Sequence, residues 1–93
     1  MKLGIITGHV VATRKDEHLV GAKLLIVQPI LPDNTPAGQP LIAVDTVGAG
    51  IGETIIYAVG SVASRASTHP NAPIDAAIVG IVDSVDCPRA GGL

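Results

Sequence analysis

Aromatic residues are nearly absent from this chain of 93 residues, which has no Trp, no Phe and a single Tyr, Tyr57. Proteins that bind single-stranded nucleic acid usually stack the bases on aromatic side chains along a basic groove. Only six residues are Lys or Arg, and the formal net charge is −2. The composition therefore argues against nucleic acid or anionic lipid as a partner. It also means that Val, Ile, Leu and Ala must build the core.

Cysteine and long apolar runs are scarce as well. Cys87 is the only cysteine, so an intrachain disulfide is excluded and a reducing cytosol is consistent with the sequence. No apolar run approaches the roughly 18 residues that cross a bilayer. The N-terminus leads directly into a strand-like pattern without a signal-peptide core. We therefore expect one cytoplasmic domain over residues 1–93, without a membrane partner.

Charged residues are also scarce. Charged residues make up 15% of the chain, compared with roughly 25% in an ordinary soluble domain. Residues 34–44, 54–64 and 76–82 carry no charge at all. A domain this small exposes much of its surface to its surroundings. The charge-free segments therefore indicate that part of the outer surface meets another subunit.

Short runs rich in β-branched residues are abundant, and they are separated by charged, Pro-rich or Gly-rich segments. They predict five strands, at residues 3–13, 23–30, 41–47, 54–59 and 76–85. The last two are apolar on both faces, whereas a half-exposed antiparallel strand alternates apolar with polar residues. We expect one face of each to fill the core and the other to meet a helix, a loop or a neighbouring subunit.

The segment between the last two strands predicts a short helix. Residues 61–66 are compatible with one or two helical turns in which Ser61 is the N-cap. Five short strands with a helix before the last one are typical of a small Greek-key barrel of the OB type. The predicted fold class is therefore all-β. Closure of the barrel would also remove exposed strand edges.

The glycine-rich segment at residues 48–52 resembles a nucleotide-binding loop only superficially. A dinucleotide fingerprint needs its third glycine one position later and a helix directly after it. The following segment, residues 54–59, is predicted as a strand, and no Lys-Ser or Lys-Thr pair marks a P-loop. We interpret the segment as a tight connection between strands, in which glycines adopt positive φ and allow backbones to approach closely.

Neither metal-ligating nor catalytic residues form a recognisable pattern. The spacing of the candidate transition-metal ligands matches no zinc signature; these are His9, His18, His69 and Cys87. Two pairs of carboxylates could converge for acid–base chemistry, or could instead bind Arg65 or cap loop amides; these are Asp45 with Glu53 and Asp75 with Asp83. We predict no catalytic residue, no metal site and no cofactor.

Four colinear segments resemble the EutN/CcmL family of bacterial microcompartment vertex proteins. They are GHVVATRK at residues 8–15, KLLIVQ at 23–28, AVDTVGAGIGE at 43–53 and PIDAAIVGIVD at 73–83. Two features differ from the family pattern. Residues 60–65 read GSVASR where members commonly have Gly-Ser-Ser-Ala-Arg, and the segment after Cys87 is shorter than in many members.

The resemblance implies an OB-like barrel that forms a homopentamer and closes a polyhedral shell together with hexameric shell proteins. It also implies a structural role and not an enzymatic one. By resemblance, the glycine-rich segment lies near the five-fold axis, where it could line a narrow pore; its residues are Gly48, Ala49, Gly50, Ile51 and Gly52. The alternative is a solitary OB module that binds single-stranded nucleic acid or a small ligand.

Overall fold

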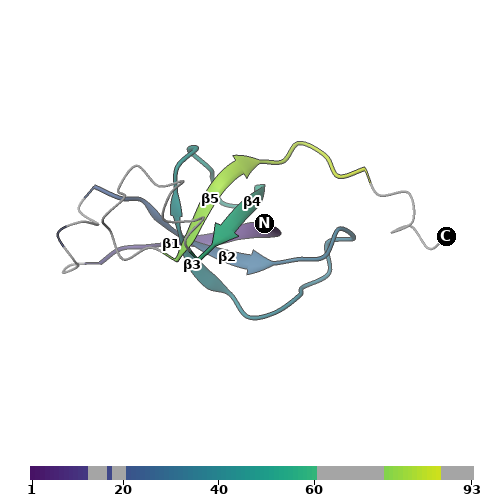
Figure 1. Cartoon of the computed structure of the whole chain (residues 1–93), viewed down its shortest axis with the longest axis horizontal. Coiled ribbons are helices and arrows are strands. Elements are labelled where there is room, and N and C mark those ends of the chain that lie inside the picture. The colour runs from purple at the N-terminus through teal and green to yellow at the C-terminus, as the bar shows by residue number, and fades with distance from the viewer. Residues whose placement is uncertain (13–16, 18–20, 61–74, 87–93) are drawn as a thin grey trace.

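The computed structural model describes residues 1–12, 17, 21–60 and 75–86. These residues form five strands, shown in Figure 1: β1 (Lys2–Val10), β2 (Leu24–Pro29), β3 (Leu41–Asp45), β4 (Thr54–Val59) and β5 (Ala76–Ile81). The predicted all-β class and the number of strands are confirmed. β1, β3 and β5 end earlier than predicted, at Val10, Asp45 and Ile81. The helix predicted at residues 61–66 lies outside the described residues.

The strands close into a barrel in the order β1-β2-β3-β5-β4, and β4 pairs with β1 to complete the circle. All neighbouring strands are antiparallel except β3 and β5, which are parallel. This five-stranded closed barrel agrees with the predicted OB-type architecture. Each described strand is paired on both sides, so none of them presents a free edge that would attract another chain.

The barrel interior is filled by aliphatic side chains packed around one tyrosine. Alternate residues of each strand point inward, and the largest fully buried side chains are Tyr57, Ile6, Leu25, Ile55, Ile78 and Val27. A second buried cluster, separate from this interior, contains Val44, Ala58 and Ala77. β4 and β5 contribute to both clusters, so part of the second face of each strand is buried as well.

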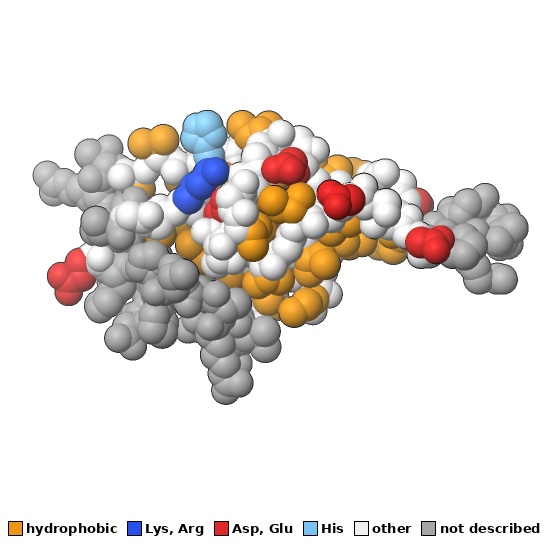
Figure 2. Space-filling model, turned by 90° about the horizontal axis from the view of Figure 1, so that it is seen from above, with side chains coloured by type: hydrophobic (Ala, Val, Ile, Leu, Met, Phe, Trp, Pro, Cys, Tyr) orange, Lys and Arg blue, Asp and Glu red, His pale blue; other side chains and the backbone are white. Residues whose placement is uncertain are grey.

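The register defines two ends of the barrel. At one end, which we call the loop mouth, Leu24 of β2 pairs with Val44 of β3, next to Lys23 and Asp45. At the other end, the open mouth, Lys2 pairs with Tyr57 and β2 finishes at Pro29. The loop between β2 and β3, residues 31–40, is exposed throughout. Figure 2 shows several apolar patches on the described surface, with polar groups and some charged side chains between them.

Candidate functional site

The glycine-rich segment belongs to the connection from β3 to β4, residues 46–53, which we call the glycine loop. β3 and β4 are not neighbours in the barrel, so this loop must pass from one part of the sheet to another. Ala49, at its centre, is 0% exposed and belongs to the interior core cluster. The loop therefore inserts one small side chain into the core, as a tight connection between strands.

The last part of the loop pairs with β1. Gly52 N donates a hydrogen bond to Ile6 O at 2.8 Å, and Ile6 N donates to Glu53 O at 3.0 Å. The segment then continues directly into β4. The predicted connection between strands is confirmed, and the helix that a dinucleotide-binding loop requires does not follow.

The three glycines of the predicted site are needed for different reasons. Gly48 and Gly52 have positive φ values of 79° and 90°, a region that other residues rarely adopt. Gly50 lies outside that region but donates its N–H to Glu53 Oε1 at 2.6 Å. A Cβ at Gly50 would lie 3.3 Å from the same oxygen. Side chains at these positions would therefore change either the backbone or the contact with Glu53.

The two carboxylates that flank the loop hold its backbone. Asp45 Oδ1 accepts hydrogen bonds from Val47 N and Gly48 N, both at 3.0 Å, and Glu53 accepts from Gly50. Of the roles considered from the sequence, the structure shows that Asp45 and Glu53 cap loop amides. These contacts replace water at backbone groups that no strand satisfies.

The second pair of carboxylates does not converge. Asp75 immediately precedes β5, and Asp83 follows it. The strand between them has six residues, which corresponds to roughly 20 Å of extended chain. Both residues are exposed. Acid–base chemistry that needs the two carboxyl groups together is therefore incompatible with this geometry.

Lys23 is a residue that the sequence analysis did not assign to the site. Its Nζ donates to Ala49 O at 3.1 Å and lies 3.6 Å from Asp45 Oδ2. Its carbonyl oxygen accepts a hydrogen bond from Asp45 N at 2.8 Å. Thr46 was missed as well, and its hydroxyl donates to Ile78 O at 2.6 Å. Only the pairing register places these groups together, so the local sequence contains no signal for them.

The outer side of the glycine loop is apolar. Ile51 is 61% exposed and Val47 is 39% exposed, whereas Ala49 points into the core. The loop therefore presents aliphatic side chains outward while its polar backbone groups are bound by Asp45, Glu53 and Lys23. Such a surface suits packing against protein more than binding of a charged ligand.

The candidate metal ligands do not form a centre in the described part of the chain. His9 is exposed on β1, and residues 18, 69 and 87 lie outside the described residues. No group of three potential His, Cys, Asp or Glu ligands occurs among the described residues. Within the same residues, no helix is long and apolar enough to span a bilayer.

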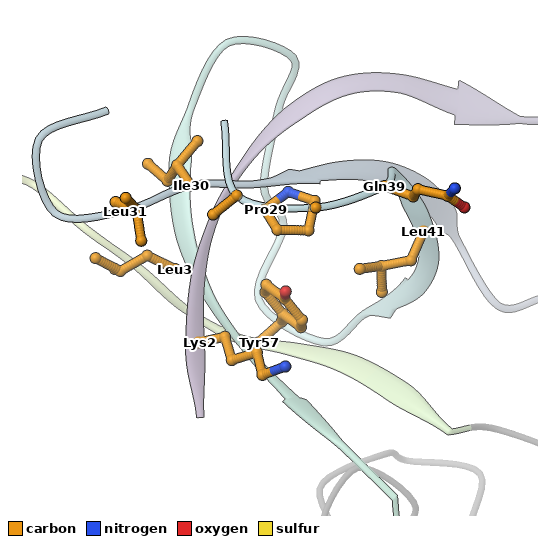
Figure 3. Close-up of a pocket in the computed structure, with 10 residues that line it drawn as sticks. Lys2, Leu3, Pro29, Ile30, Leu31, Gln39, Leu41 and Tyr57 are labelled. Carbon is orange, nitrogen blue, oxygen red and sulfur yellow. The ribbon is translucent and has the colours of Figure 1, made fainter. Parts of the chain in front are cut away.

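The open mouth contains a hollow of about 470 Å³ whose floor includes Tyr57. Figure 3 shows the tyrosine ring among Lys2, Pro29 and Leu41, with Gln39 pointing away from it. Tyr57 is 2% exposed, and burial raises the pKa of its phenol above the ordinary value of 10.0. Because this is the only aromatic side chain of the protein, no aromatic ring is available at the surface for stacking bases.

Comparison with known proteins decides the family. The sequence profile described as "Ethanolamine utilisation protein EutN/carboxysome" matches residues 1–83. The chain belongs to the EutN/CcmL family. The match includes all five strands of the barrel and the whole glycine loop.

Relatives within the EutN/CcmL family are similar over nearly their full length. The shell vertex protein GrpN of Rhodospirillum rubrum is 46% identical over 86 residues, which cover 92% of this chain and 97% of GrpN. PduN of Salmonella typhimurium, also a microcompartment shell vertex protein, is 43% identical, with 94% of this chain and 100% of PduN covered. The carboxysome shell vertex protein CcmL of Gloeobacter violaceus is 36% identical, with 91% and 85% covered.

Two of these relatives have solved structures with the same fold. The GrpN structure, described as a pentameric microcompartment shell protein, matches with a TM-score of 0.82 and covers 94% of this chain and 98% of that one. The Gloeobacter CcmL structure matches with a TM-score of 0.87 and covers 94% and 90%. The OB-like barrel expected from the family resemblance is thus confirmed.

Proposed function

We propose that this chain is a structural shell protein whose pentamers cap the vertices of a bacterial microcompartment. The observation that carries this proposal is the similarity to GrpN, which extends over 92% of the chain at 46% identity and includes the same barrel. PduN and CcmL are also named shell vertex proteins. Microcompartments lie in the cytoplasm, so we place the protein there, in the shell.

The exposed apolar surface supports assembly with other copies. Ile42 on β3 is 53% exposed and Val59 on β4 is 46% exposed. They line a hollow of about 680 Å³ together with Pro40, Leu41, Gly60, Asp75 and Ala76. In an isolated protomer these side chains contact water, and burying them contributes roughly 25 cal/mol per Å² of apolar surface.

A ring of identical copies needs two different surfaces on each copy, because each subunit contacts its neighbours in a head-to-tail manner. We propose that one such surface includes Ile51 of the glycine loop and that the other includes Ile42 and Val59, which are exposed on β3 and β4. A flat layer of hexagonal tiles cannot close, and five-fold units supply the missing curvature at the vertices. We therefore propose hexameric shell proteins as the second class of partner.

We also propose that the glycine loop lies near the five-fold axis and lines a narrow pore. Its small residues allow several copies to approach one another closely. Asp45 and Glu53 bind the loop amides of Gly48 and Gly50, so the loop can present a defined shape to neighbouring copies. The residues assigned to this position are Gly48, Ala49, Gly50, Ile51 and Gly52.

We propose no catalytic role and no cofactor for this protein. The three relatives are named as shell proteins and not as enzymes, and Asp45 and Glu53 are occupied in holding loop amides. The alternative of an OB module for single-stranded nucleic acid is not supported. The chain has six basic residues, and its one aromatic ring, Tyr57, is 2% exposed.

Native mass spectrometry of the purified chain at micromolar concentrations tests the proposal. We expect a species of five times the chain mass, and monomers or dimers alone would contradict a vertex role. Shells produced in the presence of hexameric shell proteins give a second test, because closed polyhedra should require this chain. A labelled single-stranded oligonucleotide should show no salt-dependent binding; tight binding would revive the alternative.

A further inference from the structure

One side chain from outside the glycine loop contacts both the loop and a carboxylate that binds loop amides. Lys23 Nζ donates to the carbonyl oxygen of Ala49 and also lies 3.6 Å from Asp45 Oδ2. The other oxygen of Asp45 binds two loop amides. We propose that Lys23 is the positioning residue that holds the glycine loop in the conformation required for ring assembly. This inference rests on the proposed pentamer and extends it to a residue outside the loop.

Lys23 connects the centre of the loop to a different part of the barrel. Asp45 binds the amides of Val47 and Gly48, and Glu53 binds the amide of Gly50, so both contacts are local in sequence. Gly52 bonds the last part of the loop to β1. Ala49 is 26 residues away from Lys23 in the sequence, and its methyl group offers little apolar area to hold the middle of the loop. The ammonium of Lys23 therefore adds a polar contact from another segment of the chain, at the carbonyl of Ala49 between the two amides that the carboxylates bind.

The contact involves a carboxylate that is shielded from water. The side chain of Asp45 is only 2% exposed, whereas that of Lys23 is 56% exposed. Removing the ammonium would leave a buried carboxylate without its counter-charge and the Ala49 carbonyl without this donor. Water can partly replace a half-exposed lysine head. We therefore expect a moderate effect, a roughly tenfold drop in the population of the native loop conformation. This drop corresponds to a penalty of about 1.4 kcal/mol per subunit on ring formation.

A moderate effect on each subunit has a larger effect on pentamer formation, because all five subunits must have the native loop conformation. A pentamer contains five copies of the loop, so the association constant falls with the fifth power of the competent fraction of each subunit. A tenfold drop per subunit lowers this constant by about 10⁵. The concentration at which half of the chains are in rings depends on the inverse fourth root of the constant. This midpoint concentration should therefore rise about 18-fold.

The test compares Lys23→Met with two matched variants in a dilution series followed by native mass spectrometry. Lys23→Arg keeps the charge and the donors, and should restore the wild-type midpoint to within about threefold. Lys2→Met removes the same charge from the open mouth, where Lys2 pairs with Tyr57, and should leave the midpoint unchanged. A wild-type midpoint for Lys23→Met, or an equal loss in Lys23→Arg, would overturn the inference.

Amide hydrogen exchange separates loop positioning from general loss of stability. Lys23→Met should lose protection at Val47 and Gly48, which donate to Asp45. The amide of Ile5, which pairs with Gln28 of β2, should keep its protection. Uniform loss of protection, or no change at the loop, would count against a positioning role. Because exchange can be measured on a monomer, this readout remains decisive if the wild-type chain fails to form pentamers, an outcome that contradicts only the proposed function.

Discussion

Replacing Gly4 with alanine should destabilise the barrel more than replacing any glycine that faces open space. Gly4 lies on β1 and is buried between β2 and β4. A Cβ at this position would overlap Val27 Cγ1, and it would lie 3.2 Å from Gln28 O and 3.3 Å from Tyr57 Cε1. The new methyl group would therefore meet three neighbours at once, one of them backbone.

The neighbours of Gly4 cannot move aside at low cost. Val27 is 0% exposed and Tyr57 is 2% exposed, and both belong to strands of a closed barrel. Overpacking of this kind typically costs 1–3 kcal/mol. The added methyl gains roughly 0.8 kcal/mol by burial, and alanine stiffens the unfolded chain by about 0.4–1 kcal/mol. Because the Cβ would overlap Val27 directly, we take the strain energy to be at or above the upper limit of the roughly 1–3 kcal/mol range. After the two gains are subtracted, we expect Gly4→Ala to lower the free energy of unfolding by about 2 kcal/mol.

Gly8→Ala provides the matched control on the same strand. A Cβ at Gly8 would lie 3.4 Å from Ile26 Cδ1, an ordinary contact with a flexible side chain. The two substitutions share the effect on the unfolded chain, so the difference between them isolates packing in the barrel. We expect Gly8→Ala to change the free energy of unfolding by no more than about 0.5 kcal/mol.

These effects can be measured by urea and thermal unfolding, with the near-ultraviolet signal of Tyr57 as the probe. The protein concentration must be the same for all variants, because ring formation also contributes to stability. A loss of 2 kcal/mol should lower Tm by roughly 8–16 °C. Combining Gly4→Ala with Val27→Ala should give a favourable coupling of about 1 kcal/mol or more, since the new methyl then occupies vacated space. Equal stability of Gly4→Ala and Gly8→Ala would refute the packing argument.

Two further predictions concern assembly and titration. Gly50→Val should lower the pentamer fraction in native mass spectrometry, because its Cβ would crowd Glu53 Oε1. Glu17→Gln, at an exposed position, should leave the pentamer fraction unchanged. Equal effects of the two substitutions would contradict the role of the loop. Burial raises the pKa of Tyr57, so its phenolate absorption should appear above pH 10. Since the folded state holds this proton more tightly, stability should fall as the pH rises from about 10 through the raised pKa; phenolate formation at or below pH 10 would contradict the buried position.

The positions of the strands could be predicted because their signals are local. Runs of β-branched residues bounded by Pro and Gly mark strands within a few residues, and β4 was predicted with its observed bounds, residues 54–59. The ends of β1 and β5 were wrong by three and four residues. Both apolar patterns continue beyond the backbone pairing, as Val11 and Val85 show by being 87% and 42% exposed. Where a strand stops depends on its partner, which the local pattern does not encode.

The glycine loop was predictable as a connection, and its carboxylates as possible caps, because glycines and flanking acidic residues have turn chemistry of their own. The contribution of Lys23 was not predictable in the same way. Its ammonium reaches Ala49 only because β2 and β3 pair in the register that sets Leu24 opposite Val44. A shift by one residue would turn the lysine to the other face of the sheet.

The amino-acid sequence by itself determined the class of fold, the five strands and the family, since periodicity, turn residues and colinear motifs are properties of neighbouring positions. It also determined a core without Phe or Trp and charge-free segments at residues 34–44, 54–64 and 76–82. Only the tertiary structure decided which glycine faces a crowded core and which lysine reaches the glycine loop. The physical reason is that barrel closure and register bring together residues such as Gly4 and Tyr57, whose contact depends on distance in space and not on separation along the chain.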